Sequence, residues 1–375
     1  MTEMRATSAF CTIVPPHLLE QLARHEDPEV HHSARHSLAL DAEHRDCRRL
    51  AIRSVVVPKP TLQPADSPQR TLYDARHHQG LPGIEVRAEG DRPSTDASVN
   101  RAYDGLGATF DFYLKAYGRH SVDGAGLPLH ASVHYGEGYD NAFWNGSEMV
   151  FGDGDGKTFK DFTIPLEVIG HELTHGVTQY SANLTYDGQS GALNESVSDV
   201  FGSLIKQHAL RQSAHDADWL IGEGLLETGV HGRALRSMKA PGTAYDDPRL
   251  GKDPQPAHMD HYVRTTDDNG GVHLNSGIPN HAFYLLATAL GGYAWERAGR
   301  IWYDTLTGGK LPAGADFATF AQVTATAAQA RYGDGEEKRA VLAAWAGVGV
   351  TPASHSSSVP HQSAAPEGAE SAPQG

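Results

Sequence analysis

The sequence predicts an α+β fold in two parts, a β-rich region followed by a helical half. Between Thr71 and Ile164, short alternations of apolar residues are broken by Gly and Asp, a pattern typical of strands and turns. From Pro165 onward, apolar residues recur at helical spacing instead. The length of 375 residues suggests about two domains and allows a large buried core.

The same periodicity predicts individual helices. One helix is expected inside the β-rich region, at residues 98–117, where apolar side chains follow the helical repeat. The next is expected to begin with Pro165 in its first turn, a position that proline favours. The predicted helices of the second half are 165–181, 191–208, 280–290, 299–305, 317–330 and 336–348.

Composition changes at both ends of the chain. Residues 1–68 differ from the rest and finish in a proline-rich stretch, so we expect a short propeptide and an exposed linker. Residues 69–180 are expected to form the β-rich catalytic domain and 181–349 the helical one. The remaining 350–375 have no aromatic residue and too little apolar surface to fold, which predicts a disordered tail.

Overall composition excludes several function classes. The net charge of −15 disfavours binding to nucleic acid, and no run of apolar residues is long enough to span a membrane. Two cysteines, Cys11 and Cys47, cannot staple a disulfide-rich fold. The 22 histidines instead suggest metal chemistry, although surface histidines are the simpler explanation.

The strongest chemical signal is the pentapeptide His171–His175, which reads HELTH. Its two histidines stand at positions i and i+4 of a predicted helix, so both can bind one Zn²⁺. Glu172 lies beside them, where a carboxylate can take a proton from a zinc-bound water. Burying these groups on an apolar helix would be costly without a metal, which predicts a catalytic zinc site.

A catalytic zinc takes three protein ligands and leaves one position open. Glu195, on the next predicted helix, is the best candidate for the third ligand. Asp199 follows four residues later on the same helix face and can accept the ring N–H of a zinc-binding histidine. The alternative is an amphipathic helix whose acids face solvent.

Several short segments then form a larger pattern. In order along the chain they are Asn141–Gly146, Phe151–Gly156, His171–His175, Tyr186, Gly191–Asp199, Leu235–Met238 and Asp268–Gly277. Together they resemble the thermolysin-like neutral zinc metallopeptidases, over residues 70–349. The resemblance implies a mostly-β N-terminal domain, an α-helical C-terminal domain, and the HELTH helix at the floor of the cleft between them.

The resemblance also implies an activity and its residues. The chain would be a zinc-dependent metalloendopeptidase with a preference for bulky apolar residues on the leaving-group side of the cut. His171, His175 and Glu195 would bind one Zn²⁺, and Glu172 would activate the zinc-bound water. The other implied roles are oxyanion donation by His273 and Tyr186, with Asp268 orienting His273; substrate backbone binding by Asn141, the Ala142 carbonyl and Arg236; and an apolar pocket of Phe159, Phe162, Val168, Ile221, Leu225 and Leu235. For those six, ordinary core packing is an equal alternative.

The sequence departs from the family pattern where calcium-binding acids are expected. Lys206, Leu220 and Arg233 stand at such positions, while Glu167, Asp218 and Glu223 keep the acid. An ammonium group there would oppose a calcium ion and could replace it by pairing with the acids. We therefore expect the double calcium site to be absent, and leave open whether any calcium binds.

The short leader and the PPHLL sequence at 15–19 resemble the protealysin branch of the family. We expect the leader to inhibit the enzyme as an extended segment in the cleft, and the enzyme to remove it. Cys11 could then serve as a propeptide zinc ligand, because thiolate sulfur binds zinc well. The alternative is an inert Cys11 and purely steric inhibition.

Two other functions are weighed against the endopeptidase. An inactive zinc protein would have lost the base or the oxyanion donors, which this chain keeps. An exopeptidase would need a charged group to anchor a chain terminus, which the sequence cannot place.

The expected partners are protein or peptide substrates and the chain's own propeptide, with no nucleic acid and no membrane, and a monomer is expected. Relatives are mostly extracellular, yet no standard signal peptide is visible, which leaves a cytoplasmic pool or a non-standard export route open.

Overall fold

The computed structural model describes residues 11–51 and 66–353, and of residues 45–51 only the backbone. The predictions for the linker between 52 and 65, for the tail from 354 onward and for the side chain of Cys47 lie outside this part. In the described part, none of the helices has both the length and the apolar character that crossing a membrane requires.

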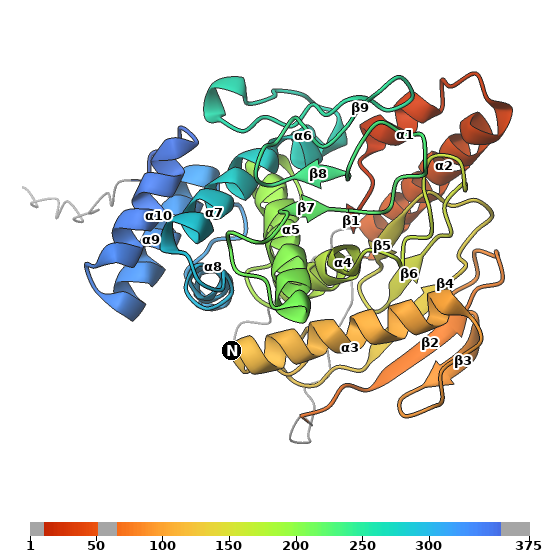
Figure 1. The fold of residues 1–375 in the computed structure, drawn as a ribbon, viewed down its shortest axis with the longest axis horizontal. Helices are drawn as coiled ribbons and strands as arrows, with labels where there is room; N and C mark the ends of the chain where they lie inside the picture. The colour runs from red at the N-terminus through yellow and green to blue at the C-terminus, as the bar shows by residue number, and fades with distance from the viewer. Residues whose placement is uncertain (1–10, 52–65, 354–375) are drawn as a thin grey trace, which may run out of the picture.

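A mixed sheet forms the β-rich part (Figure 1). Its strand order is β1-β5-β6-β4-β2-β3, with β4 parallel to β2 and β6 and the other pairs antiparallel. The strands are β1 (Cys11–Thr12), β2 (Arg70–Asp74), β3 (Ile84–Ala88), β4 (Leu129–Val133), β5 (Ala142–Trp144) and β6 (Met149–Phe151). The end strand β1 therefore comes from the N-terminal segment, which the sequence did not predict to join the sheet.

Helix α3 (Ala97–Tyr117) packs against this sheet and agrees with the predicted helix. The Asp96 side chain caps its first turn by accepting from the backbone N–H groups of Ser98 and Val99. Gly118 ends the helix in a left-handed conformation, with φ of 67°.

The helical half confirms the predicted fold class. Helices α4 and α5 start it, and two short hairpins, β7 with β8 and β9 with β10, follow before the remaining helices. The elements are α4 (Leu166–Gln179), α5 (Gly188–Leu210), β7 (Leu220–Ile221), β8 (Arg236–Ser237), β9 (Asp246–Asp247), β10 (Gly251–Lys252), η1 (Met259–His261), α6 (Asp268–Asn275), α7 (Gly277–Leu290), α8 (Ala298–Thr307), α9 (Phe317–Tyr332) and α10 (Glu336–Gly347). Pro165 is the N-cap of α4 rather than its first helical residue.

Helices α4 and α5 pack unusually closely, and this contact positions the site. A Cβ on Gly202 would lie 2.5 Å from the carbonyl oxygen of Glu167, and one on Gly170 would lie 2.7 Å from the Ile205 side chain. Position 202 therefore needs glycine, because the contact is with backbone, whereas at Gly170 the end of the Ile205 side chain would have to shift. Every residue of α4 from Glu167 to Thr178 is buried, so its polar side chains must find partners inside the protein.

The N-terminal segment is largely helical, which corrects a sequence prediction. Pro16–Leu22 forms α1 and Pro28–Ala51 forms α2, so the PPHLL sequence is not extended as expected. The extended part is Cys11–Thr12, which forms β1, and residues 13 and 14 bend between it and α1. Leu18, Leu19 and Leu22 are fully buried, because the short α1 presents them on one face. Figure 1 shows α1 and α2 beside each other, at the opposite end of the molecule from α9 and α10.

Candidate active site

Two neighbouring helices bring the predicted zinc donors together. His171 and His175 lie one turn apart on α4, and their Nε2 atoms are 3.1 Å from each other. Glu195, on α5, places Oε2 3.5 Å from the Nε2 of His171 and Oε1 3.5 Å from that of His175. All three side chains are almost completely buried.

The opposite side of each imidazole ring is held in place. The Nδ1 of His171 lies 2.8 Å from Asp199, and the Nδ1 of His175 lies 2.8 Å from the side-chain oxygen of Asn194. These contacts turn both Nε2 atoms toward Glu195, as a metal-binding histidine requires. Asp199 thus occupies the position that the sequence predicted for it.

This donor set fits a zinc ion. Burial lowers the pKa of His175 to about 3, although Glu195 opposes the shift, so the ring is neutral as a metal ligand must be. Burial by itself raises the pKa of Glu195, but neighbouring positive charges, His273 first among them and Arg236 as well, hold it below the ordinary value. The Oε2 atom of Glu195 is buried without a hydrogen-bond partner. Coordination to a metal ion would satisfy this oxygen. Two imidazoles and one carboxylate are a usual zinc ligand set.

Glu172 projects from the same helix and is fully buried. Its Oε2 accepts a hydrogen bond of 3.0 Å from the backbone N–H of Trp144, on strand β5. The sequence did not reveal this contact, because the two residues are far apart in the chain. It fixes the carboxylate between the sheet and the zinc donors.

His273 approaches Glu195 from α6, the kinked helix that follows Asp267. Asp268 accepts from its Nδ1 at 2.7 Å and from its backbone N–H at 2.9 Å, which fixes the ring. Burial lowers the pKa of His273, but Asp268 and Glu195 more than offset this and raise it to about 9. Tyr186 lies 3.3 Å from the ring and donates a hydrogen bond to Glu195. The structure thus brings His273, Asp268 and Tyr186 together beside Glu195, while Glu172 lies next to His171 on α4.

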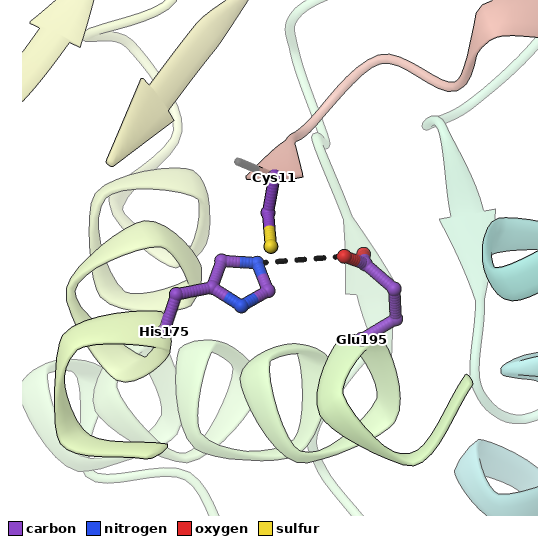
Figure 2. Close-up of side chains that lie close together, drawn as sticks. All are labelled: Cys11, His175 and Glu195. Atoms are coloured by element: carbon purple, nitrogen blue, oxygen red, sulfur yellow. Dashed lines mark ion pairs between the residues drawn. The ribbon is translucent and has the colours of Figure 1, made fainter. Parts of the chain in front are cut away.

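The N-terminal segment runs directly over these groups. Strand β1 pairs antiparallel with β5, with Cys11 opposite Trp144 and Thr12 opposite Phe143. The Cys11 sulfur, a nitrogen of His175 and an oxygen of Glu195 all lie within 4.8 Å of one another. Figure 2 shows the sulfur pointing down from β1 onto the His175 ring, with the Glu195 carboxylate beside it.

The predicted substrate-binding groups also contact this segment. Ala142 accepts from the N–H of Ile13 at 3.1 Å, and the Asn141 side chain accepts from the N–H of Val14 at 2.9 Å. Arg236 donates to the carbonyl of Ile13 at 2.9 Å. The same guanidinium makes two hydrogen bonds of 2.8 Å to Asp199, a pairing that the sequence did not predict.

The six predicted pocket residues are all buried in one hydrophobic core with Ile13. Phe159 and Phe162 lie in the loop before α4, and Val168 lies in α4 itself. Ile221 belongs to β7, Leu225 follows β7, and Leu235 directly precedes β8.

Lys206 forms the ion pairs expected from the sequence. Its Nζ lies 2.8 Å from Asp218, 2.8 Å from Glu223 and 3.5 Å from Glu167. Burial lowers the pKa of Lys206, but these three carboxylates outweigh it and raise the pKa above the ordinary value. A positive charge from the protein itself therefore lies among these acids.

Other contacts around the site had no sequence signal. Asp41, on α2, is buried and accepts from the Tyr139 hydroxyl at 2.5 Å and from Asn141 at 3.0 Å. His17, on α1, lies 3.3 Å from the Tyr245 hydroxyl. Both pairs join the N-terminal segment to the rest of the chain across more than 90 residues, so no local pattern predicts them.

Comparisons with known proteins agree with this site. The family model described as "Thermolysin metallopeptidase, catalytic domain" matches residues 66–179, and "Thermolysin metallopeptidase, alpha-helical domain" matches 182–350. An extracellular metalloprotease of Pectobacterium carotovorum is 53% identical over 329 residues, covering 86% of this chain and 92% of the relative. Protease PrtS of a Photorhabdus strain is 46% identical, covering 90% and 91%. The solved precursor of protealysin from Serratia proteamaculans is 53% identical with a TM-score of 0.82, covering 91% of this chain and all of that one.

Proposed function

The chain belongs to the thermolysin metallopeptidase family, in its protealysin branch, and is a zinc metalloendopeptidase; from that premise we propose which of its residues carry out the reaction. His171, His175 and Glu195 hold the zinc. The observation that carries this assignment is the convergence of their donor atoms, with the far side of each ring fixed by Asp199 or Asn194.

Zinc, when bound there, supplies a Lewis acid that polarises the peptide carbonyl and makes water easier to deprotonate. Glu172 takes a proton from the attacking water and gives it to the leaving amine. The N–H of Trp144 keeps this carboxylate oriented toward the reaction. His273, held by Asp268, and Tyr186 donate hydrogen bonds to the oxyanion that develops on the carbonyl oxygen.

The substrate backbone is held by Asn141, the Ala142 carbonyl and Arg236. These groups already hold a backbone segment in this structure, that of residues 13 and 14, which directly follows strand β1. The side chain that follows the cut enters the apolar set around Phe159 and Leu235, and Ile13 is buried in the same core.

Residues 1–68 are, on this proposal, the propeptide and its linker, 69–180 the β-rich catalytic domain, and 181–349 the helical domain. The propeptide inhibits by lying over the zinc donors, and the monomeric enzyme acts on protein or peptide substrates outside the cell. The name of the Pectobacterium relative, an extracellular metalloprotease, supports the location.

The decisive experiment replaces Glu172 by Ala. This change removes no zinc ligand, so zinc content measured by atomic absorption should stay near that of the wild type. Peptidase activity should fall about 10²–10⁴-fold or more, the usual contribution of a general base. The matched control is Glu296→Ala, which alters an exposed glutamate and should change neither. Retention of more than about a tenth of the activity would contradict the role of Glu172.

Specificity gives a second test. Digestion of a denatured protein, with the cut sites mapped by mass spectrometry, should show Leu, Phe, Ile or Val directly after the cut. The reason is the apolar character of the six predicted pocket residues, which are buried in the same hydrophobic core as Ile13. A preference for Lys, Arg or acidic residues at that position would contradict the proposed pocket.

A further inference from the structure

Residues 11–14 cover strand β5 in the way that an added peptide strand covers a sheet edge. β1 is the end strand of the sheet and runs antiparallel to β5. Its backbone meets the groups assigned above to substrate binding, so its register shows which peptide bond would face the catalytic groups. The inference that follows rests on the proposed function.

The contacts define this register residue by residue. His273, the proposed donor to the reacting carbonyl, lies 3.0 Å from the carbonyl oxygen of Thr12. Ala142 and Arg236 bind the N–H and the carbonyl of Ile13, the next residue. The fully buried side chain of Ile13 joins the apolar core that contains the proposed pocket. The bond between Thr12 and Ile13 therefore lies where a substrate would be cut.

Cys11 directly precedes this bond and is 1% exposed. Its sulfur approaches a nitrogen of His175 and an oxygen of Glu195, while the second oxygen of Glu195 is buried without a hydrogen-bond partner. The sulfur thus lies beside the proposed zinc ligands His175 and Glu195, and the Thr12 carbonyl lies beside His273. A thiolate is a strong zinc ligand, and a zinc with four protein ligands has no open position.

We propose that the propeptide binds as a substrate with Thr12–Ile13 at the position of cleavage, and that the Cys11 thiolate protects this bond by taking the fourth zinc position. Cleavage would require water oxygen to bond to the Thr12 carbonyl carbon, the carbon–nitrogen bond to break, and the Ile13 nitrogen to leave with a proton carried by Glu172. The thiol loses its proton when it binds zinc, and its sulfur then excludes the attacking water. Removing the sulfur should turn the inhibitor into a substrate.

The first experiment uses the full chain loaded with zinc, with Cys11 replaced by Ala. Intact mass and N-terminal sequencing should show a cut between Thr12 and Ile13 in most molecules, and a new N-terminus at Ile13. The wild type and Cys47→Ala should show no cut at this bond. The double variant C11A/E172A should also stay uncut there, which would assign the reaction to the enzyme itself. A C11A chain that hydrolyses an internally quenched peptide but leaves Thr12–Ile13 intact would overturn the proposed register.

The same quenched peptide separates the two proposals. If the wild type, after removal of its propeptide, cleaves neither this peptide nor denatured protein, the proposed function fails. If it cleaves them and only the Thr12–Ile13 bond resists in C11A, the function stands and the substrate-like register fails.

A second experiment tests the sulfur without any cleavage. The E172A full chain, which keeps Cys11, is loaded with Co²⁺ and its near-ultraviolet absorption is recorded. A thiolate-to-cobalt charge-transfer band should be present in E172A and in C47S/E172A, and absent in C11S/E172A. Absence of the band from E172A would exclude a Cys11–metal bond and leave steric inhibition as the explanation.

Discussion

Two polar clusters lie along the contact between α4 and α5, and they differ in where their positive charge comes from. His171, His175 and Glu195 converge as donors for a metal ion, and His273, whose pKa is raised, reaches one of them, Glu195, at 3.5 Å. One turn earlier on α4, Glu167 meets Lys206 of α5, which also pairs with Asp218 and Glu223. The first cluster is complete only with a metal, whereas the second carries its own cation. Helix packing is shared, so the residue type at a few positions decides which cluster needs an external ion.

The largest effect is expected from removing a donor of the first cluster. His171→Ala leaves His175 and Glu195 as the remaining donors and should lower zinc content to below about a tenth, with loss of peptidase activity. His215→Ala, at an exposed histidine, is the control and should keep both. Zinc removal from the wild type by a chelator should likewise abolish activity, and added zinc should restore it. Full zinc occupancy in His171→Ala would show that the cluster is not the zinc site.

The sequence predicted those parts of the site whose residues lie close together along the chain. His171 and His175 stand four residues apart on one helix, so spacing alone placed both on one face, with Glu172 next to His171. Glu195 was reached because it lies on the next helix and the family pattern supported it. The fold class was predicted correctly because helical periodicity extends over long segments.

The remaining features depend on contacts between distant residues, which local pattern cannot supply. The hydrogen bonds that join Ile13 and Val14 to Asn141 and Ala142 link residues more than 120 positions apart. Nothing near Cys11 in the sequence indicates a strand that pairs with β5. Helix α2 did carry a start signal, because Pro28 stands at its first position.

The second cluster can be converted into the first kind. Lys206→Asp places a fourth acid beside Glu167, so the cluster loses its own cation and should then bind calcium, which prefers carboxylate ligands. Without calcium, we expect a loss on the order of 2 kcal/mol, below the 3–5 kcal/mol of a fully buried pair because Glu223 is partly exposed. This corresponds to roughly 4–8 °C in melting temperature. Differential scanning calorimetry in the E172A background, which limits self-digestion, should show this loss and its recovery with calcium.

The wild type should behave differently in the same measurement. At fixed zinc, a calcium-selective chelator should change its melting temperature by less than roughly 3 °C, because the Lys206 ammonium already pairs with Asp218 and Glu223. Lys310→Asp, at an exposed lysine, is the control and should not become calcium-dependent. A fall of more than about 10 °C in the wild type would show that calcium stabilises the protein in spite of Lys206.

The smallest effect is expected at His134, whose positive charge is lost when the pH rises. His134, in a left-handed conformation after β4, lies 2.8 Å from Asp153 and 2.8 Å from Asp96, the N-cap of α3. The hydrogen bond to Asp153, opposed by burial and helped by Asp96, raises the pKa of His134 from 6.5 to about 9. A raised pKa means that the folded state binds the proton more tightly than the unfolded chain does. The stabilisation is therefore fully present below pH 6.5 and is lost as pH rises through 9.

His134→Gln removes this charge and tests the sign of the effect. In the E172A background at pH 6, the substitution should lower the free energy of unfolding by on the order of 1 kcal/mol, because all three groups are partly exposed. At pH 10 the same substitution should cost much less, since His134 is then neutral in the wild type as well. Urea unfolding at both pH values measures the difference, and His215→Gln, at an exposed histidine, should show no such narrowing. An equal loss at pH 6 and pH 10 would mean that the His134 ring stabilises the fold through packing and neutral hydrogen bonds. Of the His134 site and the Lys206 cluster, only the Lys206 cluster would then depend on a positive charge from the protein.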